Sequence, residues 1–207
     1  KMKKIEKELA EFRSFKKKYV FAQKEIKDIN GIKYCDGISL VDEEGKTIGE
    51  SEKWINVGYK IKGAYSKVLS NLFPYQFVFK GKKMSSIECF FQGIKFKNID
   101  MQNLVLNYSG LDSNNIKIAS DYDWKKSGIV YWQGKAINRF DEEYDNLIDE
   151  LYISALQNPL YRNVLKQCNK YILHEIGTLE KEETVFTRYE FEKQLNCLKD
   201  FLKKENT

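Results

Sequence analysis

The sequence is poor in the residues that most often bind metals or form disulfides. It contains a single histidine, His174, which excludes a metal site built mainly from histidines, and we expect this side chain to be structural. Its four cysteines, Cys35, Cys89, Cys168 and Cys197, are far apart and show none of the paired spacings typical of zinc sites or redox motifs. We therefore expect reduced thiols, no bound metal and no cofactor.

Long apolar runs are also missing. No run approaches the roughly 20 residues of a membrane span, and no segment resembles a signal peptide. Internal repeats, low-complexity segments and a glycine-rich phosphate loop are absent as well. With 207 residues, 42% of them hydrophobic, the chain is expected to form a soluble, cytoplasmic domain with a real core and no membrane partner.

Positive charge is concentrated at the start of the chain. Residues 1–27 hold ten basic and four acidic residues, a balance of +6, whereas the whole chain carries +5. The rest of the chain is therefore nearly neutral. A basic segment of this kind is either the solvated face of a helix or a source of sequence-independent attraction to nucleic acid.

The apolar pattern predicts helices mixed with short strands. Periodicity and turn signals indicate a helix near the start, hairpins in 31–63, a strand in 75–83, a loop with short helical pieces in 107–124, a strand in 128–135, and helices in 144–156, 158–168 and 187–202. Three helix starts carry cap signals: Ser85 with Glu88 and Thr187 with Glu190 are spaced as capping boxes, and Asn158 precedes a proline.

The stretch "SSIECFFQGIKF", residues 85–96, has an unusual polar pattern for a helix rich in Ile and Phe. Glu88, Gln92 and Lys95 fall at i, i+4 and i+7, so they form one polar stripe. The main apolar stripe lies on one side of them, and Cys89 and Phe96 lie on the other. A polar stripe flanked by apolar groups on both sides needs a functional or structural reason.

Several motifs in order resemble the NADAR family of YbiA-like N-glycosidases. They are "LSNLFP", "FKGKKMSSIECFFQGIKF", "YWQGKAINR" and "ETVFTRYEFEKQL", and they extend from about Tyr65 to the end of the chain. The resemblance implies an α+β, predominantly helical YbiA-like fold with a small antiparallel sheet. It places this N-glycosidase domain at residues 58–207, and leaves residues 1–57 as an accessory basic helix with a hairpin-like segment.

The resemblance also implies an activity. One branch of that family removes ADP-ribose from guanine, and another hydrolyses phosphoribosyl-aminopyrimidine intermediates of riboflavin synthesis. The segments "FDEEY" and "HEIGTLEKEETVFT" depart from the riboflavin branch. The expected function is thus hydrolysis of the bond between ADP-ribose and guanine in ADP-ribosylated DNA or RNA, with an ADP-ribosyltransferase toxin as a partner. A non-catalytic module that binds ADP-ribose or nucleic acid is the third interpretation.

Glu88 and Lys95 are the expected catalytic residues. Cleavage of an N-glycosidic bond builds positive charge at the anomeric carbon, which a carboxylate stabilises while it handles the proton. A lysine in a partly apolar site has a lowered pKa and can act as a nucleophile there. The alternatives are that Glu88 only completes a capping box with Ser85, and that Lys95 is a solvated surface side chain.

Other residues are expected to bind the substrate. Ser70 and Asn71 can hydrogen-bond ribose hydroxyls or cap a turn. Trp132, with Tyr131, offers a flat face for a base or belongs to the core. Arg139 and the neighbouring lysine can pair with a diphosphate or form ion pairs with the acidic "DEEYD". The complete predicted binding set is Ser70, Asn71, Gln92, Trp132, Lys135 and Arg139.

Overall fold

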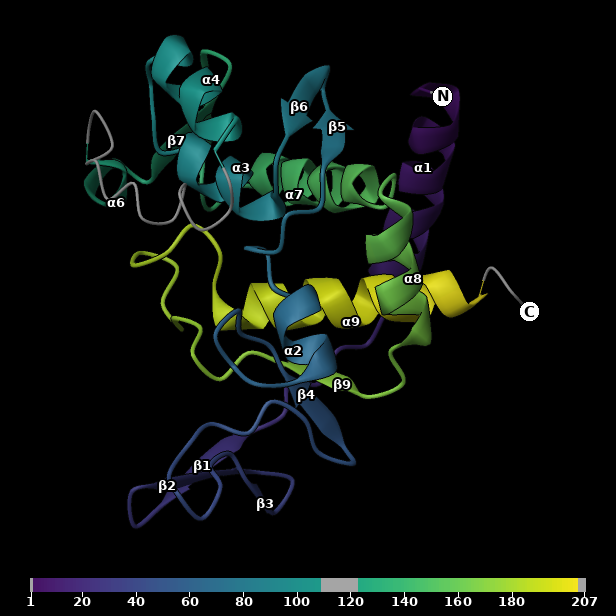
Figure 1. Ribbon diagram of the computed structural model, residues 1–207. Coiled ribbons are helices and arrows are strands. Elements are labelled where there is room, and N and C mark those ends of the chain that lie inside the picture. The colour runs from purple at the N-terminus through teal and green to yellow at the C-terminus, as the bar shows by residue number, and fades with distance from the viewer. Residues whose placement is uncertain (1, 109–122, 205–207) are drawn as a thin grey trace.

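Helices and short strands alternate along the chain in a computed structural model that describes residues 2–108 and 123–204 (Figure 1). The predicted α+β class is confirmed, while most of the predicted loop at 107–124 lies outside the described residues. The helices are α1 (Met2–Lys18), α2 (Ala64–Val68), α3 (Ile87–Gly93), α4 (Ile99–Leu106), α6 (Trp124–Ser127), α7 (Glu142–Ala155), α8 (Pro159–Gln167) and α9 (Arg188–Lys204). The strands are β1 (Ile26–Ile29), β2 (Ile32–Cys35), β3 (Ile38–Ser39), β4 (Trp54–Asn56), β5 (Phe77–Phe79), β6 (Lys82–Met84), β7 (Ile129–Trp132), β8 (Lys135–Asn138) and β9 (Tyr171–Leu173).

The strands form small, separate sheets. Strands β1, β2 and β3 make an antiparallel sheet, and β5–β6 and β7–β8 are antiparallel hairpins. Strands β2 and β3 confirm a hairpin in the first part of 31–63, and the strands predicted in 75–83 and 128–135 are confirmed as well, whereas β1 lies before the predicted range and β4 does not form the predicted hairpin. Strand β4 pairs in parallel with β9, and Ile55 lies opposite Ile172. This pair joins segments more than a hundred residues apart, so the local pattern gives no signal for it.

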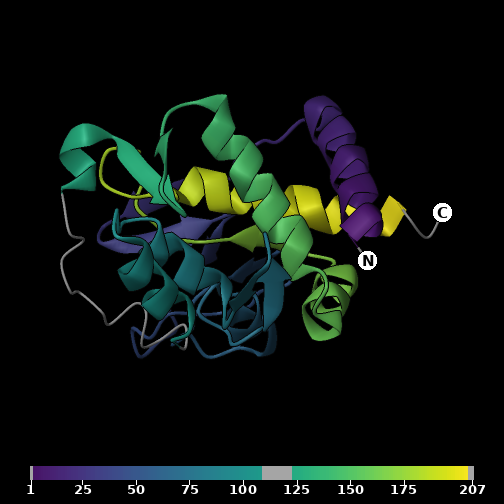
Figure 2. The same cartoon turned by 90° about the horizontal axis from the view of Figure 1, so that it is seen from above.

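Helices α7 and α9 organise the core. In Figures 1 and 2 they run across the middle of the molecule, with α1 crossing them at one end. The predicted apolar face of α9 is buried, because Phe191, Leu195, Leu198 and Leu202 are at most 3% exposed. Helix α7 is buried on several sides at once and carries nine buried residues. The other elements pack around this pair and thereby fix the walls of the site.

The basic helix α1 is laid against the body of the protein, as its periodicity predicts. Phe12 is fully buried, and its ring packs edge-to-face on Phe201 with 5.4 Å between centroids. Lys16 forms an ion pair with Asp149 of α7 at 2.5 Å. Removal of this helix would therefore expose part of the core, so the role of its charge must be tested by substitution.

Two of the predicted helix starts are confirmed. The Asn158 side chain accepts hydrogen bonds from the backbone N–H groups of the second and third residues of α8, and Pro159 occupies the first turn. Thr187 and Glu190 form a reciprocal capping box, in which the carboxylate accepts from the Thr187 N–H at 2.7 Å and the hydroxyl accepts from the Glu190 N–H at 3.1 Å. The start of α9 is thus determined by four adjacent residues.

The capping box predicted at Ser85 and Glu88 is wrong. Helix α3 begins one residue later, and Ser86 is its cap: the Ser86 hydroxyl accepts from the Cys89 N–H at 3.2 Å. The Ser85 hydroxyl turns instead toward carbonyl groups at the end of α4. Glu88 is thus the second residue of the helix and not the third, which is the position of the carboxylate in a capping box, so it is not engaged in capping. Its backbone N–H donates to the Asn71 carbonyl at 2.9 Å.

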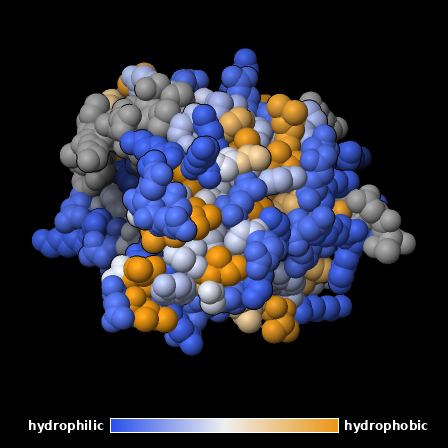
Figure 3. Space-filling model, turned by 60° about the horizontal axis from the view of Figure 1, so that its bottom comes forward, coloured by the Kyte–Doolittle hydropathy of each residue, from blue (hydrophilic) through white to orange (hydrophobic). Residues whose placement is uncertain are grey.

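The surface is polar over most of the face seen in Figure 3. Apolar residues appear there as separate patches between charged and polar ones. Across residues 2–108 and 123–204, no helix combines the length and the apolar character needed to cross a membrane.

Candidate active site

A cavity of about 300 Å³ lies over the polar stripe of α3. Four parts of the chain that are distant in sequence meet around it: the segment after β4, the segment after α2, helix α3, and the chain between β9 and α9. Its polar lining residues are Tyr59, Ser70, Asn71, Glu88, Gln92, Lys95, His174 and Thr184, and its aromatic walls include Phe91, Phe186 and Phe191. The pocket therefore brings together five of the eight residues predicted from the sequence to act at a site.

Gln92 connects the two predicted catalytic residues. Its amide nitrogen donates to Glu88 Oε1 at 2.7 Å, and its amide oxygen accepts from Lys95 Nζ at 3.0 Å. The side chain of Gln92 thus lies between the carboxyl group and the amine and is hydrogen-bonded to both on the same face of the pocket. This arrangement follows directly from the i, i+4, i+7 spacing on a helix, with Lys95 just beyond the last turn.

The protein environment shifts both groups toward their neutral forms. Burial raises the pKa of the Glu88 carboxyl, which the hydrogen bond from Gln92 and the charge of Lys95 only partly oppose. Burial lowers the pKa of Lys95, against the opposing effect of Glu88. The indole of Trp124 lies 5.7 Å from the ammonium nitrogen, and Phe91 stacks on Phe186 at 4.7 Å in the pocket wall. A proton-donating carboxyl and a nucleophilic amine are the forms that such a site favours.

Ser70 and Asn71 line the pocket opposite α3. The Asn71 side-chain oxygen accepts a hydrogen bond from the hydroxyl of Tyr152 at 2.9 Å, so its NH₂ group faces away from that tyrosine and can donate elsewhere. Ser70 accepts from the Leu72 N–H at 3.3 Å and so caps a turn while it borders the cavity. Tyr152 was not expected from the sequence, because only the fold brings α7 under this turn.

His174 also lines the pocket, although the sequence suggested only a structural role. Its Nδ1 lies 2.9 Å from the Val57 carbonyl oxygen. A carbonyl can only accept, so Nδ1 carries the hydrogen, and the Nε2 lone pair is an acceptor. Burial lowers the pKa of the ring, which keeps it neutral. The position just after a buried strand is the one sequence feature that could have drawn attention to it.

Trp132 and Lys135 are placed away from this pocket. Trp132 is 7% exposed and packs between the rings of Phe79 and Phe90, at 5.0 and 5.4 Å. Lys135 is exposed and pairs with Glu143, a member of the acidic "DEEYD" segment. Both residues border a different cavity of about 250 Å³. Trp132 therefore makes the contacts of a core residue, and Lys135 makes the ion pair with the acidic segment that was the alternative to phosphate binding.

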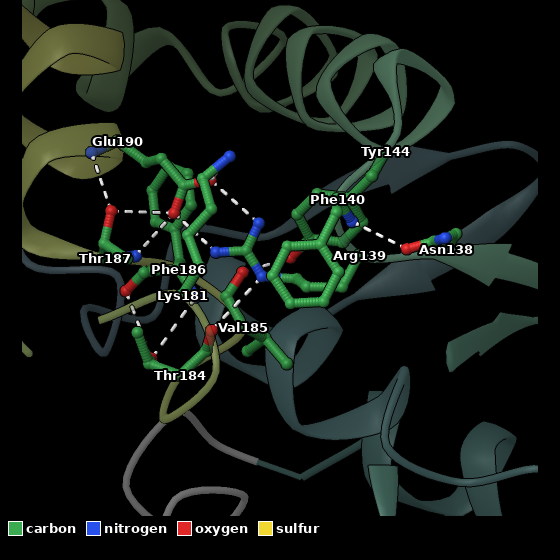
Figure 4. A network of polar contacts seen from close by, with 10 residues as sticks. All are labelled: Asn138, Arg139, Phe140, Tyr144, Lys181, Thr184, Val185, Phe186, Thr187 and Glu190. Carbon is green, nitrogen blue, oxygen red and sulfur yellow. Dashed lines mark hydrogen bonds and ion pairs between the residues drawn. The ribbon is translucent and has the colours of Figure 1, made fainter. Parts of the chain in front are cut away.

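Arg139 lies behind the pocket wall and does not face the cavity. It is 1% exposed, and its guanidinium donates two hydrogen bonds, of 2.8 and 2.5 Å, to the Glu190 carboxylate (Figure 4). Its Nε donates to the Thr184 carbonyl at 3.2 Å, and its plane lies 4.7 Å from the Tyr144 ring. Arg139 therefore ties the start of α9 to the 184–186 segment, which forms one wall of the pocket. Its partner is Glu190 and not the acidic segment that follows it in sequence.

Replacement of Arg139 is expected to destabilise the fold in a pH-dependent way. Arg139→Gln removes the two strongest hydrogen bonds of the largely buried Glu190 carboxylate and leaves it the longer ion pair with Lys181 at 3.6 Å, which should cost about 3 kcal/mol of unfolding free energy. Burial alone would raise the pKa of Glu190, but the bonds from Arg139 and Thr187 outweigh it and hold the pKa below its usual value of 4.5. The stabilisation is thus complete above about pH 4.5 and is lost as the pH falls through the folded-state pKa. Urea unfolding between about pH 7 and pH 2 measures this.

Lys135→Gln is the matched control, because it removes an exposed pair from the neighbouring hairpin. A loss for Arg139→Gln no larger than that of Lys135→Gln, or a loss independent of pH over the acidic range, would contradict the structural role.

The chain belongs to a phage protein family. The family model of "Bacteriophage protein GP30.3" matches residues 63–200, so the chain is a member of that family. It is similar to the "Uncharacterized 17.1 kDa protein in Gp30-rIII intergenic region" of Enterobacteria phage T4, with 31% identity over 141 residues, 66% of this chain and 91% of that protein. No solved structure matches the chain.

The assignment to the NADAR family was wrong, because the family model that matches is that of GP30.3. The four motifs that suggested it are short and consist of common residue types, which unrelated proteins can share. What stands of the fold prediction is the α+β class. The matched residues 63–200 include every pocket residue except those directly after β4.

Proposed function

We propose that this protein is an N-glycosidase that uses Lys95 as the nucleophile and Glu88 as the general acid and base. One observation carries the proposal: Gln92 is hydrogen-bonded to both groups within a pocket that shifts the pKa of each toward its neutral form. A neutral amine next to a protonated carboxyl is suited to the displacement of a basic leaving group from a carbon that bears oxygen.

In the first step the lone pair of Lys95 Nζ attacks the anomeric carbon and forms a C–N bond. The bond between that carbon and the base breaks, and its electron pair stays with the base nitrogen. The Glu88 carboxyl gives its proton to the departing base. Glu88 is then a carboxylate and the lysine nitrogen is positively charged, and the proximity set by Gln92 stabilises this charge pair.

In the second step the sugar ring opens. Glu88 takes a proton from the lysine nitrogen and passes it to the ring oxygen as the carbon–oxygen bond breaks, which leaves a protonated Schiff base. Water adds to the imine carbon, the amine leaves, and the free sugar closes again. The net reaction consumes one water and yields the base and the sugar. Asn71 and His174 line the same cavity and offer a donor and an acceptor for the sugar hydroxyls.

Among N-glycosides, we propose ADP-ribose linked to guanine in nucleic acid as the substrate, so the reaction reverses guanine ADP-ribosylation. The aromatic walls of the cavity can flank the scissile bond and its base. Within the described residues, its lining contains no arginine and no lysine except Lys95, whose pKa burial lowers. Both ADP-ribose and a phosphoribosyl-aminopyrimidine carry a phosphate on O5 of the reacting ribose, so the assay below, and not the lining of the cavity, distinguishes the two substrates. An ADP-ribosyltransferase must supply the ADP-ribosylated substrate.

A non-catalytic ADP-ribose module is the rival to this proposal. Such a module binds phosphate with charged lysine or arginine side chains. Placing a lysine where burial lowers its pKa, beside a carboxyl group, weakens anion binding and favours covalent chemistry. The pocket therefore supports the enzyme over the binding module.

The assay is the release of sugar from a guanine-modified single-stranded oligonucleotide. We expect free ADP-ribose and unmodified oligonucleotide as products, separated by chromatography, in the presence of a metal chelator. The same preparation is offered a phosphoribosyl-aminopyrimidine. Cleavage of that compound without release of ADP-ribose would transfer the proposal to the smaller substrate, and binding of ADP-ribose without cleavage of either would favour the non-catalytic module.

A further inference from the structure

A second cavity lies outside the proposed active site. It is a groove of about 590 Å³ between α1 and α9, and α7 forms its floor. The two cavities share Phe186, which stacks on Phe91 on the active-site side. The two cavities are therefore neighbours on either side of this ring.

The two helices present cations to this groove. Arg13, Lys16 and Lys17 come from α1 and Lys193 comes from α9. Lys16 is paired with Asp149, but in the part of the chain that the structure describes no carboxylate lies within ion-pair distance of Lys17 or Lys193. The acidic residues of the groove belong mainly to its floor on α7, where burial raises the pKa of Asp145. The rims are thus more positive than the floor.

Two buried nitrogen donors at the groove have no acceptor among residues 2–108 and 123–204. They are Arg13 Nε and Gln194 Nε2. The Gln194 amide cannot simply be reversed, because its oxygen accepts from Lys16 Nζ at 2.7 Å and an ammonium can only donate. Both nitrogens are enclosed by protein atoms, so their N–H dipoles add positive potential to the wall of the groove without a direct contact to a ligand.

Aromatic side chains accompany the cations. Tyr189 is 43% exposed on the α9 rim, with Lys193 Nζ 5.8 Å from its ring centroid, and Phe186 closes the inner end. Cations along a groove together with exposed aromatic rings are typical of proteins that bind single-stranded nucleic acid, because phosphates pair with the cations and bases stack on the rings.

We infer that the groove between α1 and α9 binds the phosphate backbone of a single-stranded nucleic acid whose modified base enters the pocket past Phe186. This inference rests on the proposed function, because the N-glycosidic bond sets the position of the strand relative to Glu88 and Lys95. It also gives the positive start of the chain a specific site of action on one face of α1.

The test neutralises one cation on each rim. Lys17→Gln and Lys193→Gln, singly and together, are compared with Lys7→Gln, which removes an exposed lysine that pairs with Glu11 on the same helix α1. Binding of a labelled, unmodified single-stranded oligonucleotide is measured by fluorescence anisotropy over a range of salt concentrations. Each groove variant should weaken binding about fivefold at 0.1 M salt and lower the salt slope by about 0.7, the value for one lost phosphate contact on a single strand.

Cleavage of a small ADP-ribosyl-guanosine substrate should be unchanged in the two single groove variants, in the double variant and in Lys7→Gln. Oligonucleotide binding that is equal in wild type and groove variants, or reduced to the same extent by Lys7→Gln, would overturn the inference even if cleavage is normal. A lack of cleavage of any substrate would overturn the proposed function separately. Binding of an acidic peptide in place of the oligonucleotide, weakened by the same variants, would overturn the inference and identify a protein partner.

Discussion

Glu88→Gln should reduce turnover of the modified oligonucleotide at least ~10²-fold while the protein remains folded, which is the usual scale for a positioned acid or base. The glutamine keeps the shape and the hydrogen bond to Gln92 but can neither donate a carboxyl proton nor take one up. Because Ser86, not Ser85 with Glu88, caps α3, no capping energy is lost. The measurement is the rate of release of ADP-ribose together with the melting temperature.

The matched control is Asp100→Asn, which removes a carboxylate from the first turn of the neighbouring helix α4. It should leave turnover near the wild-type rate. A Glu88→Gln protein with wild-type turnover and a lowered melting temperature would show that the carboxyl group stabilises the helix and takes no part in the chemistry.

Lys95→Arg should abolish both turnover and covalent trapping. If the amine attacks the anomeric carbon, the ring-opened adduct is an imine, and borohydride added during turnover reduces it to a stable secondary amine. Peptide mass spectrometry should then place the mass of the sugar on Lys95 in the wild type. Arginine keeps the positive charge but stays protonated near neutral pH, so it cannot act as the nucleophile.

Lys97→Arg provides the control for this experiment, because Lys97 is an exposed lysine only two residues away and is not part of the pocket lining. It should retain turnover and trapping. If Lys95→Arg remains active, the lysine serves as an electrostatic partner, and Glu88 would have to activate water without covalent help. If the trapped mass lies on another lysine, the assignment of the nucleophile is wrong.

Local sequence patterns predicted the helices and their starts with good success. The capping box at Thr187 and Glu190 and the cap at Asn158 involve residues within four positions of each other, so their geometry depends little on the rest of the fold. The failure at Ser85 has the same local origin. Two adjacent serines offered two possible caps, and in the fold the Ser85 hydroxyl donates to the Leu106 carbonyl at the end of α4 while Ser86 caps α3.

The predicted site residues also divide into those whose position follows from local spacing and those whose position depends on the fold. Glu88, Gln92 and Lys95 share one face because of their spacing on a helix, and the structure shows the two hydrogen bonds that join them. Trp132 and Arg139 were predicted from their chemical type, which does not indicate whether a side chain points into the pocket or into the core. Trp132 is part of the core, and Arg139 is bound to Glu190, fifty-one residues away.

The sequence by itself determined the α+β class, the buried face of α9 and the polar stripe of α3, because each depends on periodicity within one element. The tertiary structure alone decided what closes the pocket around that stripe. Tyr152 orients Asn71, Val57 sets the tautomer of His174, and Arg139 anchors the 184–186 wall. These contacts join residues 45 to 117 positions apart. Local periodicity carries no signal for them, since they depend on how whole elements pack.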